Sequence, residues 1–365
     1  MNEMTSTPPD LAIVIVSYNT SALLRDCLDS VFRSTGDLSL AVCVVDNASP
    51  DDSVPMVRAE FPQVHVIANT SNVGYPQANN QGLRYFGYRD LTPDPSPRRD
   101  LNPDPATRRD LNPDPAPRRD LTPDPSPARR GEASPPALEG KGAGGSGPRY
   151  ALLLNPDTVL PPDALAKMLA FMEAHPQAGV AGPKLVRLDG SLDKACRRSF
   201  PTPTTSLYHL LKLDRLFPNS PRFARYDLSY LDPDIVTRVD AIVGAFMLVR
   251  REAIAQAGLL DETFWMYGED LDWAKRITDA GWQVWYNPAV TVTHIKEAAS
   301  RHSYRARVEF YRALIIFYEK HYRVTTAFWL DWLIRSGIAV FGGLDLLGRR
   351  LRGRLGRIEG PGATA

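Results

Sequence analysis

Short apolar strands alternate with amphipathic helices at the start of the chain. Residues 11–16 and 40–45 are continuous apolar runs rich in β-branched side chains, a pattern typical of strands buried inside a parallel sheet. Between them, apolar side chains recur at helical spacing over 23–32, and a second helical pattern leads to a third strand at 64–68. This alternation predicts an α/β fold with an open, mainly parallel sheet. Ligands of such sheets bind at the carboxyl ends of the strands.

A proline-rich repeat then interrupts the pattern. From Asp90 a ten-residue unit, DLTPDPSPRR, recurs three more times in slightly changed form, and a stretch rich in Gly, Ser and Ala follows to about residue 147. Proline at alternating positions forbids helices and sheet ladders, so residues 89–148 are predicted to be an extended or disordered insertion. It is either an inert surface loop or a basic, proline-rich docking site for a partner.

The alternation resumes beyond the insertion. Residues 150–154 form an apolar strand, 163–174 an amphipathic helix, and 239–249 an apolar stretch that contains Gly244. We therefore predict a single α/β domain that is interrupted by the repeat. Its parts are a nucleotide-binding part at 1–88, the insertion at 89–148, a metal and acceptor part at 149–305, and C-terminal helices at 306–365.

The composition excludes some classes of protein. The 43 Lys and Arg side chains balance the 42 Asp and Glu, so no global field marks a nucleic-acid binder. The three cysteines, Cys27, Cys43 and Cys196, have no zinc-type spacing, and we expect buried free thiols in a reducing compartment. The first ten residues lack the features of a secretory signal, which favours a cytoplasmic location. Residues 327–347 contain three charged side chains, which argues against a spanning helix.

Acidic side chains follow two of the predicted strands. Asp46 comes after the second strand, and Asp157 comes after the strand at 150–154. An Asp in this position is either a ligand-binding group or a turn or helix cap. Pro156 fixes the backbone so that Asn155 and Asp157 can both turn toward one hard cation, such as Mg²⁺ or Mn²⁺.

A second acidic cluster begins a predicted helix near residue 270. Glu269, Asp270 and Asp272 follow an aromatic stretch at 264–268 that could line a pocket. The alternative is that these acids only stabilise the helix start through its dipole. His294 follows a β-rich segment and is either a metal ligand or a core histidine whose hydrogen bonds are satisfied.

Taken in this order, the motifs resemble the GT-A type glycosyltransferases of family 2, and within that family the rhamnosyltransferase-like branch. The resemblance covers nearly all of the chain outside the repeat and the C-terminal tail. It rests on residues 13–19 (IVIVSYN), 44–49 (VVDNAS), 72–75 (NVGY), 78–82 (ANNQG), 153–158 (LLNPDT), 244–247 (GAFM) and 264–270 (FWMYGED), followed by His294.

The resemblance implies a GT-A fold and an inverting transfer of a sugar from a nucleoside diphosphate, without a covalent intermediate. Asp270 would be the catalytic base, with Glu269 beside it. Asp157 and His294 would hold a divalent cation, Mg²⁺ or Mn²⁺. Asp46 would bind the nucleotide base. The other expected donor-binding residues are Ser17, Tyr18, Asn19, Asn72, Gly74, Asn155 and Arg198.

Two departures and one alternative accompany this expectation. Asn155 stands where the family's metal motif has an Asp, which removes one negative charge and should weaken cation binding. The repeat enters where the family usually has a short connection. Arg197 and Arg198 either meet donor or acceptor phosphates or form a solvated basic pair.

The expected partners follow from the same resemblance. We expect a dTDP- or UDP-sugar donor, with rhamnose as the best single choice, and a glycan or polyprenyl-diphosphate-linked acceptor in cell-surface polysaccharide synthesis. The alternative function is a non-catalytic nucleotide-sugar-binding protein that the insertion has disabled.

Aromatic side chains at 328–332 precede a run of arginines between 349 and 357. This pattern suits a helix on an anionic membrane surface, here the cytoplasmic face of the inner membrane. The alternative is that the helix packs against the catalytic domain.

Overall fold

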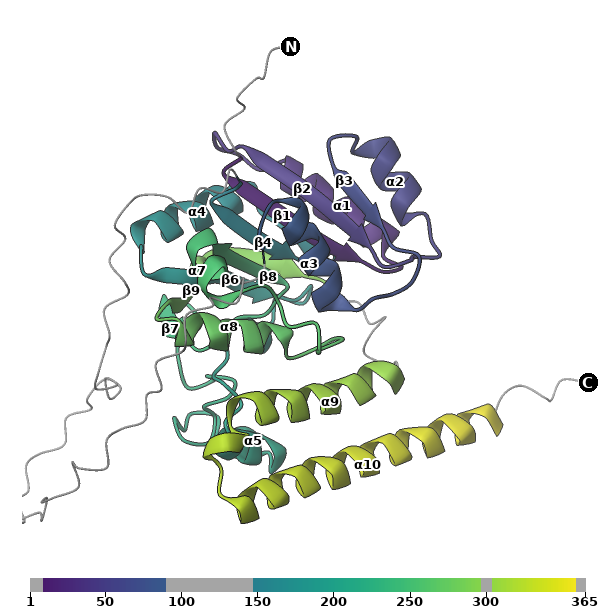
Figure 1. Ribbon diagram of the computed structural model, residues 1–365, viewed down its shortest axis with the longest axis vertical. Helices are drawn as coiled ribbons and strands as arrows, with labels where there is room; N and C mark the ends of the chain where they lie inside the picture. Colours follow the sequence, from purple (N-terminus) through teal and green to yellow (C-terminus); the bar gives the residue numbers. More distant parts are fainter. Residues whose placement is uncertain (1–8, 90–146, 297–303, 359–365) are drawn as a thin grey trace, which may run out of the picture.

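The computed structural model describes residues 9–89, 147–296 and 304–358 (Figure 1). Nearly all of the predicted insertion at 89–148 therefore lies outside the described residues. The strands are β1 (Leu11–Ser17), β2 (Leu40–Asp46), β3 (His65–Ala68), β4 (Tyr150–Leu154), β5 (Thr158–Val159), β6 (Ala178–Val186), β7 (Thr237–Val239), β8 (Phe246–Arg250) and β9 (Gln283–His294). The helices are α1 (Ser21–Phe32), α2 (Ser53–Glu60), α3 (Tyr75–Tyr85), α4 (Ala164–Ala174), α5 (Pro203–Leu210), α6 (Leu213–Leu216), α7 (Arg251–Ala257), α8 (Glu269–Asp279), α9 (Tyr304–His321) and α10 (Phe328–Ile358).

The strands form one sheet in the order β3-β2-β1-β4-β8-β6-β9-β5, with β7 paired to β9. The half from β3 to β4 is entirely parallel, and β8 then joins both β4 and β6 in antiparallel orientation. The predicted α/β fold with a mainly parallel sheet is confirmed, and the antiparallel β8 makes the sheet mixed. The apolar stretch predicted at 239–249 is instead divided between β7 and β8, because the loop between them leaves the sheet.

Helices cover both faces of the sheet. Alternate side chains of β1 point to opposite faces, so that Ile13 and Ile15 pack with α1, α2 and α4. Val14 and Val16 pack with α3, α7, α8 and α9 on the other face. The strand is buried on both sides, which explains why its sequence is continuously apolar.

Gly82 allows α3 to lie very close to β1. A Cβ atom at this position would lie 2.5 Å from Val14 Cγ1, so any larger residue would push the helix off the strand. This close packing holds the start of α3 at the carboxyl ends of the parallel strands and its end at the opposite edge.

The two ends of the insertion meet at that opposite edge, which we call the far edge and define as the side where β1 and β4 begin. The Tyr88 hydroxyl donates to Pro148 O at 3.0 Å. Arg251 Nε donates to the same carbonyl at 2.7 Å, and its guanidinium lies 4.5 Å from the centre of the Tyr88 ring. The chain therefore leaves and re-enters the domain away from the carboxyl ends of the strands.

The cysteine prediction is confirmed, because Cys27, Cys43 and Cys196 are buried free thiols. At the C-terminus, α9 packs on the domain and α10 runs beside α9 (Figure 1). Within the described ranges, no helix combines the length and the apolar character needed to cross a bilayer.

Candidate active site

The first group of predicted residues gathers where β1 and β2 end. The sheet register places Ser17 opposite Asp46. Asp46 is buried, and its carboxylate accepts hydrogen bonds from the backbone N–H (2.9 Å) and the hydroxyl (2.5 Å) of Ser49. The same hydroxyl accepts a bond from the Asn19 N–H at 2.9 Å. Asp46 thus fixes a turn, and each of its oxygens keeps a lone pair for a ligand.

Ser17 and Tyr18, at the end of β1, differ in exposure. The Ser17 hydroxyl is buried and lies 2.9 Å from that of Thr20, while the Tyr18 side chain is largely exposed. Ser17 therefore shapes the strand end, whereas Tyr18 is free to contact a ligand.

The loop at 72–75 is fastened to the aromatic stretch before α8. Asn72 Oδ1 accepts a bond from the Gly74 N–H at 3.0 Å, and the Tyr75 N–H donates to Trp265 O at 2.8 Å. Gly74 has φ +91°, and a Cβ there would lie 2.6 Å from the same Trp265 oxygen. Only glycine fits this approach. The predicted donor loop and the predicted pocket wall are therefore neighbours.

The Tyr75 hydroxyl links the donor side of the site to the loop before β8. It lies 3.2 Å from Asn155 Oδ1 and 3.0 Å from Gly244 O. Burial raises the pKa of Tyr75, and the charges of Glu269, Asp270 and Asp157 raise it further. The phenol therefore stays protonated as a donor. Because the Gly244 N–H bonds Asp270, Tyr75 and Gly244 link Asn155, after β4, to the first turn of α8.

Asp270 occupies the first turn of α8 with most of its hydrogen-bonding capacity used. Its Oδ2 accepts bonds from Arg198 Nη2 at 2.6 Å and the Gly244 N–H at 3.2 Å. Its Oδ1 accepts the Leu271 N–H at 2.7 Å. A carboxylate has about four lone-pair positions, so one position on Oδ1 is open to an incoming hydroxyl.

Glu269 is buried next to Asp270, and its Oε2 has no hydrogen-bond partner among the described residues. Burial and the neighbouring charge of Asp270 raise the pKa of Glu269 to about 8. At neutral pH the Glu269 side chain therefore holds a proton in the folded protein.

His294 lies between two carboxylates at the end of β9. Its Nε2 is 3.3 Å from Asp157 Oδ1, and its Nδ1 is 2.8 Å from Asp193 Oδ2. Lys296 also bonds Asp193, at 2.9 Å. Burial opposes the charge on the imidazole, but the bonds to Asp157 and Asp193 outweigh it and raise the pKa of His294 to about 9. The histidine is thus both buried and satisfied, and it directs one ring nitrogen at the predicted metal carboxylate.

Comparison with protein families assigns the chain. The glycosyl transferase family 2 model matches residues 12–88, and the glycosyltransferase like family 2 model matches residues 130–309. Together they span most of the chain, including all the carboxylates described above. The chain belongs to glycosyltransferase family 2.

Its curated relatives are rhamnosyltransferases. The N-acetylglucosaminyl-diphospho-decaprenol L-rhamnosyltransferase of Mycobacterium tuberculosis is 24% identical over 357 residues, which cover 96% of this chain and 98% of the relative. Rhamnosyltransferase WbbL of Escherichia coli is 30% identical over 146 residues, 40% of this chain and 52% of that protein. This family 2 glycosyltransferase is therefore rhamnosyltransferase-like in sequence.

A solved structure supports the fold. The crystal structure of GalNAc-T7 with UDP, GalNAc and Mn2+ matches with a TM-score of 0.50 at 14% identity. The match covers 86% of this chain, which spans about half (48%) of that longer protein. At this identity the likeness concerns the fold, and it agrees with the predicted GT-A architecture.

The adjacent arginines of this family 2 glycosyltransferase do not form a solvated pair, so that alternative is wrong. Arg197 is buried and donates to Asp232 O at 2.8 Å and Leu231 O at 2.6 Å. Arg198 instead pairs with Asp270. The difference arises because neighbouring side chains on an extended segment point to opposite sides, one into the backbone of 231–232 and one into the site.

The third acid of the second cluster has a structural role. Asp272 is fully buried and faces α9, where it pairs with His321 Nε2 at 2.7 Å and Lys320 Nζ at 2.9 Å. Arg276 of its own helix pairs with it at 2.9 Å. Asp272 therefore ties α9 to α8 and leaves no open position for a ligand.

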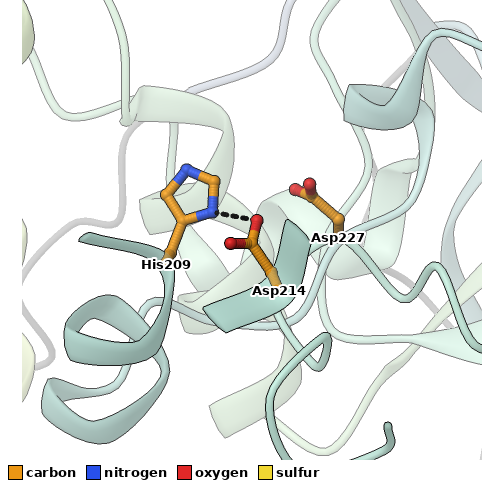
Figure 2. Close-up of side chains that lie close together, drawn as sticks. All are labelled: His209, Asp214 and Asp227. Carbon is orange, nitrogen blue, oxygen red and sulfur yellow. Dashed lines mark hydrogen bonds and ion pairs between the residues drawn. The ribbon is translucent and has the colours of Figure 1, made fainter. Parts of the chain in front are cut away.

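Another acidic group lies on different elements. Within the described ranges, His209, Asp214 and Asp227 form a group whose potential ligand atoms lie within 4.8 Å of one another (Figure 2). His209 Nδ1 is 3.0 Å from Asp214 Oδ2, and Lys194 is 3.9 Å from Asp227. The sequence predicted none of these residues, because they share no ligand spacing and join only through folding.

Sequence reasoning also missed Asp193, Lys296 and the role of Tyr75. Tyr75 belongs to the NVGY motif at 72–75, so the sequence indicated that it lies near the site but did not indicate its hydrogen-bond partners. Asp193 and Lys296 had no such signal, because their importance depends on the approach of a loop to β9.

Proposed function

We propose that this glycosyltransferase transfers rhamnose, with inversion, from a dTDP- or UDP-linked donor to a glycan or polyprenyl-diphosphate-linked acceptor in cell-surface polysaccharide synthesis. The observation that carries the proposal is Asp270, a carboxylate with one open lone-pair position that is linked through Gly244 and Tyr75 to Asn155 after β4. The choice of rhamnose and of a lipid-linked acceptor is supported by the mycobacterial relative, which matches over almost its whole length.

In the proposed step, the open position of Asp270 Oδ1 accepts the proton of an acceptor hydroxyl. The hydroxyl oxygen forms a bond to the anomeric carbon as the bond from that carbon to the diphosphate oxygen breaks. The nucleoside diphosphate leaves with the bonding electrons, and the single displacement inverts the anomeric centre. Arg198 and the Gly244 N–H hold the other carboxylate oxygen, so the reacting oxygen is fixed in place.

Asp157 and His294 would hold the divalent cation, Mg²⁺ or Mn²⁺. Their oxygen and nitrogen lie 3.3 Å apart, and a cation held by both would displace the proton that the imidazole Nε2 shares with Asp157, while Asp193 orients the imidazole through its other nitrogen. A bound cation would neutralise the departing diphosphate. Asn155 offers only a neutral oxygen, which already bonds Tyr75, so the protein supplies little negative charge of its own to the ion.

The donor contacts are part of the proposal. Asp46, with Ser17, Tyr18 and Asn19, would meet the nucleotide, and Asn72 and Gly74 would lie beside it. Arg198 is proposed to reach the diphosphate. Its Nε has no hydrogen-bond partner among the described residues, which supports a ligand contact.

The non-catalytic alternative is less well supported. The insertion begins and ends at the far edge of the sheet, away from the carboxylates, so it gives no physical reason for a disabled site. A location on the cytoplasmic face of the inner membrane is proposed from the expected lipid-linked acceptor.

The test is an assay of the purified full chain with dTDP-rhamnose or UDP-sugars and a short-chain prenyl-diphospho-N-acetylglucosamine acceptor, with Mg²⁺ or Mn²⁺. We expect a rhamnosylated product whose anomeric configuration, by NMR, is inverted relative to the donor. Asp270→Asn should lower the rate by about 10²–10⁴-fold, the usual contribution of a general base. It should leave nucleotide binding by calorimetry intact.

Asp279→Asn is the matched control, because Asp279 is an exposed acid at the other end of α8. Its rate should equal that of the wild type. Transfer by Asp270→Asn at the wild-type rate would show that Asp270 is not the base. Turnover with another sugar but not with rhamnose would refute the donor assignment alone.

A further inference from the structure

Two acidic side chains of the long C-terminal helix α10 face α9. Asp331 Oδ1 accepts a bond from the Tyr318 hydroxyl at 3.0 Å, and Asp345 Oδ2 accepts one from Arg307 Nε at 2.6 Å. Asp331 and Asp345 are about four helical turns apart, so they lie on the same side of α10. Both acids that interrupt this apolar sequence are therefore used to fasten the helix to α9.

The other side of α10 carries large apolar side chains without cover. Phe328 is 86% exposed, Trp329 68% and Trp332 66%. At about 100° per residue, the large apolar side chains of α10 that are described as exposed fall within an arc of about 140°, most of it on the side opposite the two aspartates. We call this arc the outer face of α10, and it consists of Phe328, Trp329, Trp332, Leu333, Val340 and Leu347.

The outer face lies at the margin of the molecule. Figure 1 shows α9 between the sheet and α10, so α10 is separated from the domain core. An amphipathic helix on a globular domain normally buries its large apolar side chains, whereas α10 leaves several of them exposed. Large exposed apolar patches of this kind mark surfaces that bind a protein or a membrane.

The charge of the following segment favours a membrane over a second copy of the chain. Five arginines lie between 349 and 357, and no acidic residue occurs from 346 to 358. A second copy would bring the same positive charge to the contact, whereas an anionic bilayer brings the opposite charge. Tryptophan also prefers the boundary between lipid headgroups and acyl chains, where its ring is buried and its N–H stays hydrated.

We propose that the outer face of α10 binds the surface of an anionic lipid bilayer, with the helix lying in the interface and the arginine segment among the headgroup phosphates. This proposal deepens the proposed function, on which it rests for its purpose. It holds the enzyme at the surface where a lipid-linked acceptor presents its sugar. The binding itself needs neither donor nor acceptor.

The experiment is flotation of the full chain with vesicles of phosphatidylcholine, with or without phosphatidylglycerol. We expect binding that requires phosphatidylglycerol and weakens as salt is raised, because screening reduces the attraction of the arginines. Trp329→Ser/Trp332→Ser should weaken binding about tenfold or more, since two interfacial aromatic anchors are lost.

The matched control is Leu188→Ser/Ile235→Ser, which removes two exposed apolar side chains far from α10 in sequence. It should bind vesicles like the wild type. Thermal unfolding should show that both variants are folded, and both should transfer sugar to a water-soluble acceptor at the wild-type rate.

Equal flotation of Trp329→Ser/Trp332→Ser and the wild type would overturn the proposal. The proposal would also be overturned if the wild type did not bind the vesicles and sedimentation showed that it dimerises through the outer face. Failure of the proposed function is separate, because it would appear as absent rhamnose transfer while flotation is unchanged.

Discussion

The two edges of the sheet use charged side chains in different ways. At the far edge, Arg250 and Arg251 donate to backbone carbonyls, and Arg251 also covers an aromatic ring. The opposite side, where the parallel strands end, is called the carboxyl edge. There, charged groups face one another, as in the pair of Arg198 with Asp270 and the bonds of His294 to its two carboxylates. An arginine bonded to backbone carbonyls stabilises the fold. A member of an ion pair can instead bind a charged ligand in place of its protein partner. The comparison predicts that changes at the carboxyl edge affect the reaction and that changes at the far edge do not.

Asp272 offers the most demanding test, because it lies two residues from Asp270 on the same helix but forms ion pairs only within the fold. Burial alone would raise the pKa of Asp272. The bond from His321 and the charges of Arg276 and Lys320 outweigh burial and lower the pKa to about 2. Asp272→Asn should cost about 3–5 kcal/mol of unfolding free energy at pH 7, as expected when a buried ion pair loses one partner. Urea unfolding measures this effect.

The pH dependence of that loss has a defined sign. The folded-state pKa lies below the usual value near 3.9, so the stabilisation is present above about pH 4 and disappears as the pH falls toward 2. The difference between Asp272→Asn and wild type should shrink over that range. Asp279→Asn, which loses only an exposed ion pair, should cost less than about 1 kcal/mol. An Asp272→Asn variant that is stable but inactive would show that Asp272 belongs to the reaction.

Glu269 should give the opposite pH dependence. Burial and the charge of Asp270 raise its pKa to about 8, so the folded protein keeps a proton that the unfolded chain loses near pH 4.5. Stability from this group therefore declines as the pH rises from about 4.5 to 8, by at most about 1.4 kcal/mol per pH unit. Glu269→Gln should remove that decline in unfolding experiments between pH 5 and 8. Parallel stability curves for the two proteins would contradict the assigned protonation.

A variant of Asp193 tests whether cation binding at the carboxyl edge depends on residues that hold the proposed metal ligands in position. Asp193→Asn keeps the shape of the side chain but removes the charge that holds His294 and Lys296. Loss of such a partner typically weakens metal binding by about 10–100-fold. Calorimetry with Mn²⁺ in the presence of the nucleoside diphosphate measures the change. Asp189→Asn, an exposed acid in the preceding turn, is the control. Unchanged affinity in Asp193→Asn would remove His294 from the proposed metal site.

The sequence could predict the strand ends but not the contacts between them. Asp46 and Asp157 were identifiable because each follows a buried apolar strand, and parallel strands end at one edge. The pairing of Arg198 with Asp270 could not be predicted, because 72 residues separate them and the contact depends on how the loop before β8 leaves the sheet. Asp193 was missed for the same reason. The division of the apolar stretch at 239–249 into two strands was not predicted either. The pattern of apolar residues does not show that the Gly244 N–H leaves the sheet to bond the Asp270 carboxylate.

The insertion should have the smallest effect of all. Replacing residues 91–146 with a short Gly/Ser linker leaves Tyr88 and Pro148, whose side-chain and carbonyl oxygens lie 3.0 Å apart, on either side of the join. Because loop-closure entropy grows only logarithmically with length, the unfolding free energy should stay the same or rise slightly. The transfer rate should remain within about twofold of the wild type, measured with the water-soluble acceptor. A folded deletion variant that binds the donor but transfers no sugar would place part of the insertion in the reaction, and the separation between the two edges would then fail. Full activity would mean that the far edge tolerates a large change because its contacts hold the fold and do not reach the reacting groups.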